Sequence, residues 1–329
     1  MPKLSLSLAV GAYEHVRDLS TGAIPVEGIE LTTVHNPIED VLYRTHKHAE
    51  WHVAELGLGG YVARLARGEQ PYVAIPVFTS RVFRHSCIYV HKDAGINTPA
   101  NLNGKRVGMP EWGMAAAIWA RGMLTDEYGL DQASIHWVQG GLHEPGRMDR
   151  SPPDQKLGLD YQVVQDKALN SMLLSGEIDA MFSARLPDAM ALPNSPVKRL
   201  FTDLQQVESD YWQRTGIFPI MHMMGIRRDV YEQHPWAAQE LYRGFLSAKD
   251  RSLARARDTS SAYFPVPLML YAVQKATEIG GPDFWPYGVT PNLKTLQTFL
   301  RYAHAQGVTD RTLSVDELFA PETLSSTRT

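Results

Sequence analysis

The stretch ANLNGKRVGMPEWGMAA, residues 100–116, places a glycine turn, a short apolar strand and the start of an alanine-rich helix in direct succession. The helical pattern runs on to Gly129, a residue type that favours a helix end. Further along, MLLSGEIDAMFSARLPDA, residues 172–189, gives the end of a helix, a glycine turn and another strand. Alternation of this kind predicts an α/β protein with a largely parallel sheet.

The rest of the chain repeats the alternation and then changes character. Apolar runs bounded by turn residues predict strands, and 3.6-residue periodicity predicts helices. The C-terminal third, 229–329, is expected to be mainly helical. The remaining expected elements are strands at 4–11, 28–34, 72–78 and 135–141, a helix at 37–48, and a strand that turns into a helix through glycines at 51–68.

Composition excludes several classes of protein. The 329 residues carry a net charge of −4, without the basic face that nucleic-acid binding requires. The single cysteine, Cys87, excludes an intramolecular disulfide. No run of about 18 apolar residues predicts a membrane span, and no secretory signal is recognisable at the N-terminus. We therefore expect a cytoplasmic protein that binds neither nucleic acid nor membranes.

Polar side chains follow nearly every expected strand. In an open α/β sheet, ligands bind beyond the carboxyl ends of the strands, so these side chains are the candidate site. Arginine is common among them, and its planar donors match the two oxygens of a carboxylate. Trp112 or Phe83 is a candidate ring contact. The set comprises Tyr13, Glu14, His15, Arg17, Glu55, Thr79, Ser80, Arg81, Arg84, His85, Glu111, Trp112, His143, Glu144, Arg147, Ser183, Arg185 and His222.

The two quoted stretches resemble the bilobal substrate-binding proteins of the type II periplasmic fold. That family has a similar glycine turn at the opening of its second lobe, and a similar helix–strand unit returning to the first. The resemblance implies two mixed sheets flanked by helices. It predicts a first lobe of residues 1–90 plus 200–329 and a second of 91–199, with crossings near 88–100 and 183–200.

A narrower resemblance covers four separate blocks in order. They are IPVFTSRVFRHSCIYV (75–90), GMPEWGMAAAIWARGML (108–124), HWVQGGLHEPGR (136–147) and FPIMHMMGIRRDVYEQHPW (218–236). Together they are similar to the 4,5-dihydroxyphthalate decarboxylase family. The resemblance implies a cytoplasmic enzyme that converts 4,5-dihydroxyphthalate to protocatechuate and carbon dioxide, and enzymes of this kind often form homo-oligomers.

Such a reaction needs a proton donor at a ring carbon, a hydrogen bond or base at the phenol, and an anchor for the carboxylate that stays. Candidates for proton transfer are His85, Glu111 and His143, because histidine titrates near neutrality and a buried glutamate can be raised toward it. Candidates for substrate binding are Arg17, Ser80, Arg81, Arg84, Trp112, Arg147, Arg185 and His222. No cofactor is expected, although Glu111, His85 and His143 leave a divalent metal open.

Each signal also has a structural interpretation. The segment 79–85 could be a surface loop, HEPGR (143–147) a simple turn, and His222 a core histidine, since it lies between methionines. Two rival functions stay open from the sequence. One is a non-catalytic solute-binding protein for a carboxylate, and the other is a relative of a pyrimidine-precursor synthase on the same fold.

Overall fold

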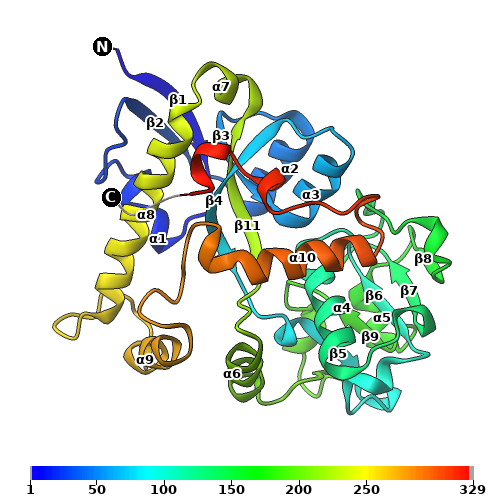
Figure 1. Cartoon of the computed structure of the whole chain (residues 1–329). Helices are drawn as coiled ribbons and strands as arrows, with labels where there is room; N and C mark the ends of the chain where they lie inside the picture. The colour runs from blue at the N-terminus through cyan, green and yellow to red at the C-terminus, as the bar shows by residue number, and fades with distance from the viewer. Residues whose placement is uncertain (1, 326–329) are drawn as a thin grey trace.

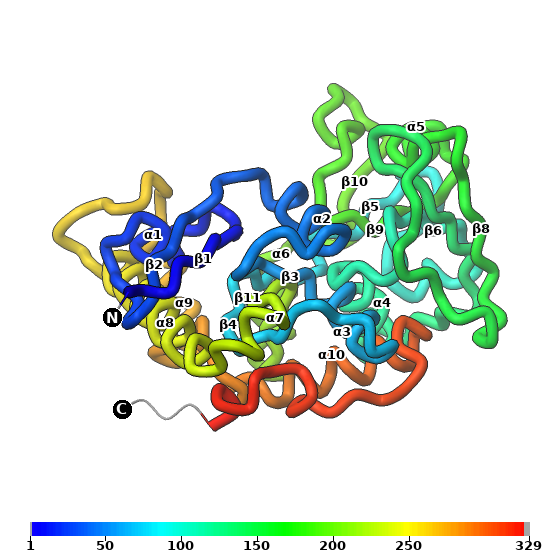
Figure 2. Tube along the Cα trace, turned by 90° about the horizontal axis from the view of Figure 1, so that it is seen from above, coloured from blue at the N-terminus to red at the C-terminus, as the bar shows by residue number. Residues whose placement is uncertain are grey.

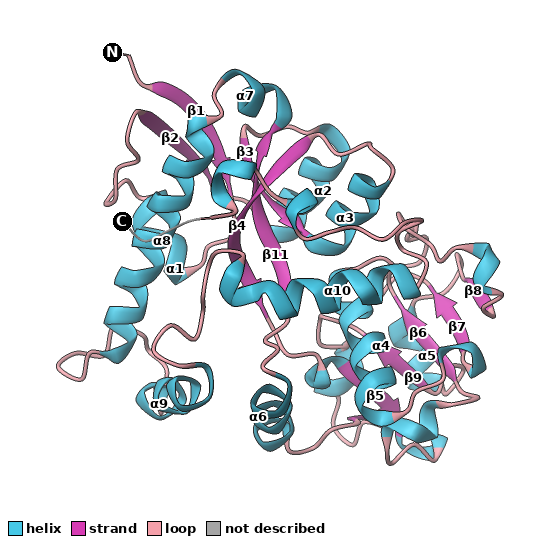
Figure 3. Ribbon diagram, in the orientation of Figure 1, coloured by secondary structure: helices cyan, strands magenta, loops and turns pink. Residues whose placement is uncertain are grey.

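Two β-sheets form the frame of the computed structural model, which describes residues 2–325 (Figures 1 and 3). The first sheet has the strand order β2-β1-β3-β11-β4. Strand β1 pairs in parallel with β2 and β3, whereas β11 is antiparallel to β3 and β4. Its strands are β1 (Leu4–Ala9), β2 (Ile29–Val34), β3 (Val53–Gly57), β4 (Tyr72–Arg81) and β11 (Ile220–Arg227).

The second sheet has the order β10-β5-β9-β6-β7-β8. Strands β6, β7, β8 and β9 run parallel to their neighbours within this set, and β5 is antiparallel to both β9 and β10. The expected pair of mixed sheets is thereby confirmed. The strands are β5 (Ile88–His91), β6 (Arg106–Met109), β7 (His136–Gln139), β8 (Tyr161–Val163), β9 (Ala180–Phe182) and β10 (Val197–Arg199).

Helices flank both sheets, and the C-terminal third is mainly helical as expected. The helix expected after residue 113 is α4, which ends at Gly129 with φ of 69°, a left-handed conformation that favours glycine. The helices are α1 (Glu14–Ser20), α2 (Ile38–His48), α3 (Leu58–Ala66), α4 (Ala115–Tyr128), α5 (Leu169–Ser175), α6 (Leu204–Thr215), α7 (Arg228–Gln233), α8 (Trp236–Arg257), α9 (Met269–Gly280) and α10 (Leu293–Ala305). None of them is both long and apolar enough to cross a membrane.

The chain passes between the sheets twice. It leaves the first sheet after Arg81 and enters the second at Ile88, and it returns between Arg199 and Ile220 through α6. We refer to the parts built on the two sheets as the first and second lobes. The lobe boundaries drawn from the sequence stay a prediction. They place residues up to 90 in the first lobe, whereas β-pairing places Ile88–His91 in the second sheet.

Two contacts hold the lobes together along one side. Helix α10 contacts both α3 of the first lobe and α4 of the second, and Figure 2 shows it running along the edge of both halves. The backbones of α3 and the α4 entry also approach closely. A Cβ atom placed on Gly59 would lie 2.1 Å from the carbonyl oxygen of Gly113. Gly59 therefore allows a spacing between the lobes that no larger residue permits.

Gly59→Ala is expected to lower the free energy of unfolding by roughly 1–3 kcal/mol, because two backbones would have to separate. Gly60→Ala is the matched control in the same helix. Its new Cβ would meet no atom closer than 3.7 Å, and alanine in a helix gains about 0.5–1 kcal/mol over glycine. Denaturant unfolding of both variants measures the difference, and equal stabilities would contradict the close approach.

Candidate active site

A buried carboxylate organises the edge of the first sheet at the carboxyl ends of β1 and β3. Glu55 of β3 is fully buried. Its carboxylate accepts hydrogen bonds from the Gly11 N–H at 2.9 Å, the Tyr13 hydroxyl at 2.8 Å and Nδ1 of His222 at 2.8 Å. We call Tyr13, Glu55, Ser80 and His222 the Glu55 cluster. Tyr13 and His222 hydrogen-bond Glu55, and Ser80 hydrogen-bonds Tyr13 and is the β4 partner of His222, so the cluster joins β3, β4, β11 and the end of β1.

The electrostatics of the cluster favour a charged Glu55. Burial alone would raise the pKa of this carboxyl, but hydrogen bonds from His222, Gly11 and Tyr13 outweigh it, and the pKa is lowered. The pKa of Tyr13 is raised by its own burial and by the adjacent Glu55 charge. Tyr13 is therefore a neutral donor, and the negative charge of the cluster lies on Glu55.

His222 lies at an irregularity in the β4–β11 ladder. It is paired with Ser80 of β4 and Gly57 of β3, and the register with β4 shifts on both sides of it. Pro76 of β4 lies within the irregular stretch and has no N–H for the ladder. Such irregularities redirect side chains and occur often beside active sites. The side chain of His222 keeps 21% of its surface exposed while its partner Glu55 has none.

A second histidine packs beside the cluster. The ring of His15 stacks on Tyr13 and lies against Trp285, each at 5.2 Å between centroids. Its Nε2 donates to the carbonyl of Thr79 at 3.0 Å. Burial lowers the pKa of His15 to about 4, so this ring is neutral at pH 7. It packs between Tyr13 and Trp285 as an aromatic group.

A cavity of about 360 Å³ lies between the first turn of α2 and the second lobe. The second-lobe walls are the segments that follow β6, β7 and β9, which is the edge where the sequence placed ligand-binding groups. The polar residues that line it are Glu39, His143, Glu144, Arg147, Ser183 and Arg185.

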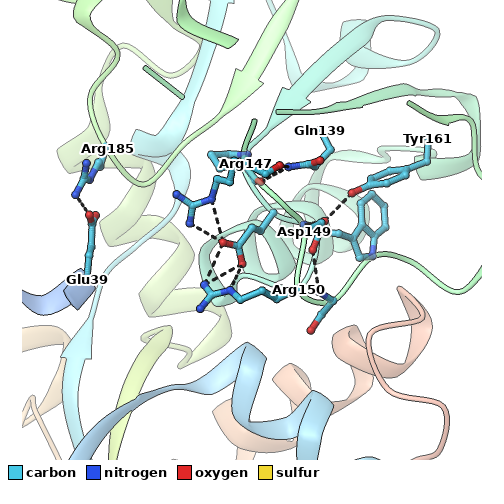
Figure 4. Close-up of polar contacts among 11 residues, drawn as sticks. Glu39, Gln139, Arg147, Asp149, Arg150, Tyr161 and Arg185 are labelled. Atoms are coloured by element: carbon cyan, nitrogen blue, oxygen red, sulfur yellow. Dashed lines mark hydrogen bonds and ion pairs between the residues drawn. The ribbon is translucent and has the colours of Figure 1, made fainter. Parts of the chain in front are cut away.

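Two arginines converge on one carboxylate beside this cavity, and one of them, Arg147, lines it (Figure 4). Glu111, which is nearly buried, accepts from Arg147 at 2.6 and 3.0 Å and from Arg150 at 3.0 Å through both of its nitrogens. The arginine side chains keep 44% and 38% of their surface exposed. Each guanidinium is thus held by Glu111 and still partly exposed to solvent. We call Glu111, Arg147 and Arg150 the arginine pair site.

Neighbouring groups hold the loop that carries both arginines. Asp149 accepts the Trp112 N–H and the Tyr161 hydroxyl, both at 2.6 Å. The amide of Gln139 donates to the Arg147 carbonyl at 2.9 Å. These contacts come from β7, β8 and the segment after β6 (Figure 4). The positions of Arg147 and Arg150 are therefore set by the sheet.

Two further ion pairs border the cavity. Arg185, which follows β9, pairs with Glu39 of α2, so this contact joins the two lobes (Figure 4). His143 lies 2.9 Å from Asp188 through Nδ1. Both pairs are largely exposed to solvent.

The structure separates the cationic segment 79–85 from this cavity. Strand β4 continues to Arg81, whose buried guanidinium donates to the carbonyls of Phe218 at 3.1 Å and Pro286 at 2.8 Å and to the side chain of Asn292. Arg84 is buried, with Nε 3.0 Å from the sulfur of Met221. Both cations are engaged inside the protein, and neither lines the cavity.

His85 lies in an aromatic surrounding formed by Tyr128, Phe201 and Tyr211, at 5.1–6.1 Å between ring centroids. It is fully buried, and neither ring nitrogen makes a hydrogen bond within residues 2–325. In this conformation it has no path to a ligand in the cavity.

The other predicted residues divide between the two clusters and the structural core. His222 and Ser80 belong to the Glu55 cluster, and Glu111, His143, Arg147 and Arg185 lie at the cavity or beside it. Trp112 is buried, donates to the Gln306 carbonyl at 2.8 Å and packs against the guanidinium of Arg121. Arg17 is exposed on α1 and pairs with Glu14 at 3.5 Å.

Sequence reasoning did not assign a role to Tyr13, Glu55 or Arg150. The first two follow strands and were visible as polar residues at strand ends. Arg150 follows Arg147 by three residues in GRMDR. This second arginine in the same loop is the sequence feature that could have indicated it. No group of three or more His, Cys, Asp or Glu side chains within residues 2–325 is arranged to hold a metal ion.

Comparison with known proteins agrees with this architecture. No protein-family model matches the chain. The periplasmic sulfonate-binding protein of Methylobacillus flagellatus KT superposes with a TM-score of 0.55 at 15% identity, over 99% of this chain and 94% of that one. The fold, two mixed sheets flanked by helices, is thus of the periplasmic-binding-protein-like kind.

Two sequence relatives define the family. A protein named 4,5-dihydroxyphthalate decarboxylase from Comamonas testosteroni is 37% identical over 327 residues, which span 99% of each chain. A protein of the same name from Pseudomonas putida is 37% identical over 218 residues, or 65% of this chain and 83% of that one. The chain belongs to the 4,5-dihydroxyphthalate decarboxylase family.

The surroundings of His85 predict acid sensitivity. Burial lowers its pKa to about 4 from an ordinary value of 6.5. The unfolded chain therefore takes up a proton at this residue before the folded chain does. The contribution of His85 to the free energy of unfolding is fully present above pH 6.5. It falls by about 2–3 kcal/mol as the pH drops toward 4.

His85→Leu should remove that part of the pH dependence, since leucine cannot take up the proton. Urea unfolding at pH 7 and pH 4.5 measures it, with His35→Leu as the control at an exposed position. If His85→Leu lost as much unfolding free energy between pH 7 and pH 4.5 as the wild type does, His85 would not be the source of the acid sensitivity.

Proposed function

We propose that the protein decarboxylates 4,5-dihydroxyphthalate, or a closely related hydroxylated aromatic dicarboxylate, to protocatechuate and carbon dioxide. The observation that carries the proposal is the identity of 37% across 99% of the chain with a protein of that activity by name. A fold of this kind hosts many functions, so the chemistry has to be argued from the site.

The reaction has a defined electronic requirement. Direct loss of carbon dioxide would leave an aryl anion, which is too unstable to form. Protonation of the ring carbon that bears the carboxylate avoids it, and the hydroxyl para to that carbon supplies the electron density. The bonding pair returns to the ring as carbon dioxide leaves. An enzyme must therefore deliver a proton and hold the second carboxylate.

The arginine pair site supplies the anchor. Two guanidinium groups share one carboxylate, so Glu111, Arg147 and Arg150 together keep one positive charge at the cavity. Arginine binds carboxylates through two parallel hydrogen bonds. Arg185 adds a third guanidinium on the same wall, at present paired with Glu39. A dicarboxylate entering between the lobes meets cations on the second-lobe side.

Among the three candidates for proton transfer named from the sequence, His143 is the one that lines the cavity. Both oxygens of Glu111 are engaged by arginines, and His85 is enclosed by aromatic rings. Burial of the substrate on lobe closure would strengthen these electrostatic interactions.

The rival interpretation, a solute-binding protein without catalysis, is not favoured because both curated relatives are named as decarboxylases. A cytoplasmic location and self-association belong to the same proposal and follow from the enzyme interpretation. The proposal includes no metal, since the protonation step draws its electron density from the substrate hydroxyl.

Purified protein mixed with 4,5-dihydroxyphthalate is expected to release carbon dioxide and protocatechuate in equal amounts, followed by absorbance and by gas detection. Dialysis against a chelator should leave the rate unchanged. Tight binding without carbon dioxide release would contradict the enzyme proposal. If chelation abolished the rate and a divalent cation restored it, the reaction would depend on a metal.

Arg147→Ala is expected to raise KM by roughly 10–100-fold, because a charge-assisted hydrogen bond contributes about 1.5–3 kcal/mol. Arg67→Ala is the control, since Arg67 pairs with Glu69 on the exposed surface. Steady-state kinetics on both variants tests the anchor. Equal KM values would remove Arg147 from it.

A further inference from the structure

Glu55 is an unusual buried acid. Its side chain has no exposed surface, and among residues 2–325 its salt-bridge partner is His222, with no lysine or arginine. The other buried glutamate, Glu111, has two arginines. Burying a carboxylate is unfavourable, and an apolar residue would serve packing alone at least as well. This arrangement is therefore better explained by what Glu55 does to His222.

The hydrogen bond fixes the imidazole. A carboxylate only accepts, so Nδ1 of His222 carries a hydrogen that it donates to Glu55 at 2.8 Å. The second ring nitrogen, Nε2, makes no hydrogen bond to the described residues. A carboxylate that orients an imidazole and stabilises its charged form leaves the opposite nitrogen ready to give or take a proton.

Glu55 is itself immobilised. Its second oxygen is held by the Gly11 N–H, and Tyr13 shares the first oxygen with His222. Gly11 is required here, because a Cβ atom at this position would lie 2.6 Å from the Tyr13 ring. The cluster thus holds its carboxylate in a single orientation toward His222.

His222 is not among the residues that line the 360 Å³ cavity, but it lies on the first lobe close to where the chain crosses between the lobes. It is the third residue of β11, which begins directly after the chain returns from the second lobe (Figure 1). Its neighbour Ser80 comes directly before Arg81, where β4 ends and the chain departs for the second lobe. The irregular pairing at this point and the partial exposure of the ring distinguish it from a packed core histidine.

We propose that His222, oriented by Glu55, is the catalytic residue that delivers the proton to the substrate ring. The inference rests on the proposed decarboxylase function and deepens it. The second lobe holds the carboxylate that stays, and the first lobe supplies the proton. Glu55 is a positioning residue, since it acts through His222.

The step balances as follows. The His222 imidazolium gives the proton on Nε2 to the ring carbon bearing the departing carboxylate. The carbon–carbon bonding pair returns to the ring as carbon dioxide leaves, which restores the aromatic product. The imidazole, still donating through Nδ1 to Glu55, then takes a proton from water.

The test uses a reaction that a structural role would not affect. By microscopic reversibility, the reverse reaction adds carbon dioxide to the product carbon and returns its hydrogen to His222, so repeated turnover exchanges that hydrogen with solvent. Wild-type protein incubated with protocatechuate and bicarbonate in deuterium oxide should label this position, followed by NMR. His222→Gln should lose exchange and kcat by about 100-fold or more, with KM within about threefold.

Matched variants separate chemistry from folding. Glu55→Gln should lower kcat by about 10–100-fold with little change in KM, since the amide no longer stabilises the imidazolium. His52→Gln is the control, because His52 directly precedes β3 of the same sheet but hydrogen-bonds Ser7 of β1 and not Glu55. The double variant Glu55→Gln with His222→Gln leaves no unpaired charge in the cluster. It replaces a single variant in the same assays if that variant folds poorly.

Two failures can be told apart. If wild-type protein releases no carbon dioxide, the proposed function falls, and the inference falls with it. If the wild type is active and a folded His222 variant keeps its rate and its exchange within about threefold, the function stands and the role of His222 is overturned.

Discussion

The pairing of β4 with β11 is the constraint on which the other features depend. These neighbouring strands carry the chain out of the first sheet and back into it, so their ends mark where the lobes meet. The buried guanidinium of Arg81 ties the end of β4 to the Phe218 and Pro286 carbonyls, which fixes the departing chain. Ser80 and His222 face each other next to this anchor, at the irregular part of the ladder.

Charge is distributed unequally between the lobes. The first lobe presents a buried negative group, Glu55, whose partners are hydrogen-bond donors and one imidazole. The second presents guanidinium groups that outnumber their carboxylate. In the proposed reaction this separation is useful, because a dianionic substrate is attracted by one wall and receives its proton from the other. Glu55 can remain close without repelling the substrate strongly, since its charge is shared among three donors.

The sequence predicted the architecture better than the roles of single residues. The motifs at 100–116 and 172–189 identified the fold because their turns, strands and helices are local patterns. Arg81, Arg84 and His85 were expected at the ligand, but β4 runs three residues past Phe78, and these side chains turn into the protein. Glu55 was visible at a strand end, yet its partners lie 44 and 167 residues away in the chain, and no spacing rule connects them.

A crystal structure with bound phthalate, which lacks the activating hydroxyls, tests the division of roles between the lobes most directly. One carboxylate is expected within hydrogen-bond distance, about 3 Å, of Arg147 or Arg150, with Nε2 of His222 directed at the ring carbon of the other. Phthalate bound with both carboxylates on the second lobe and its ring out of reach of His222 would contradict it.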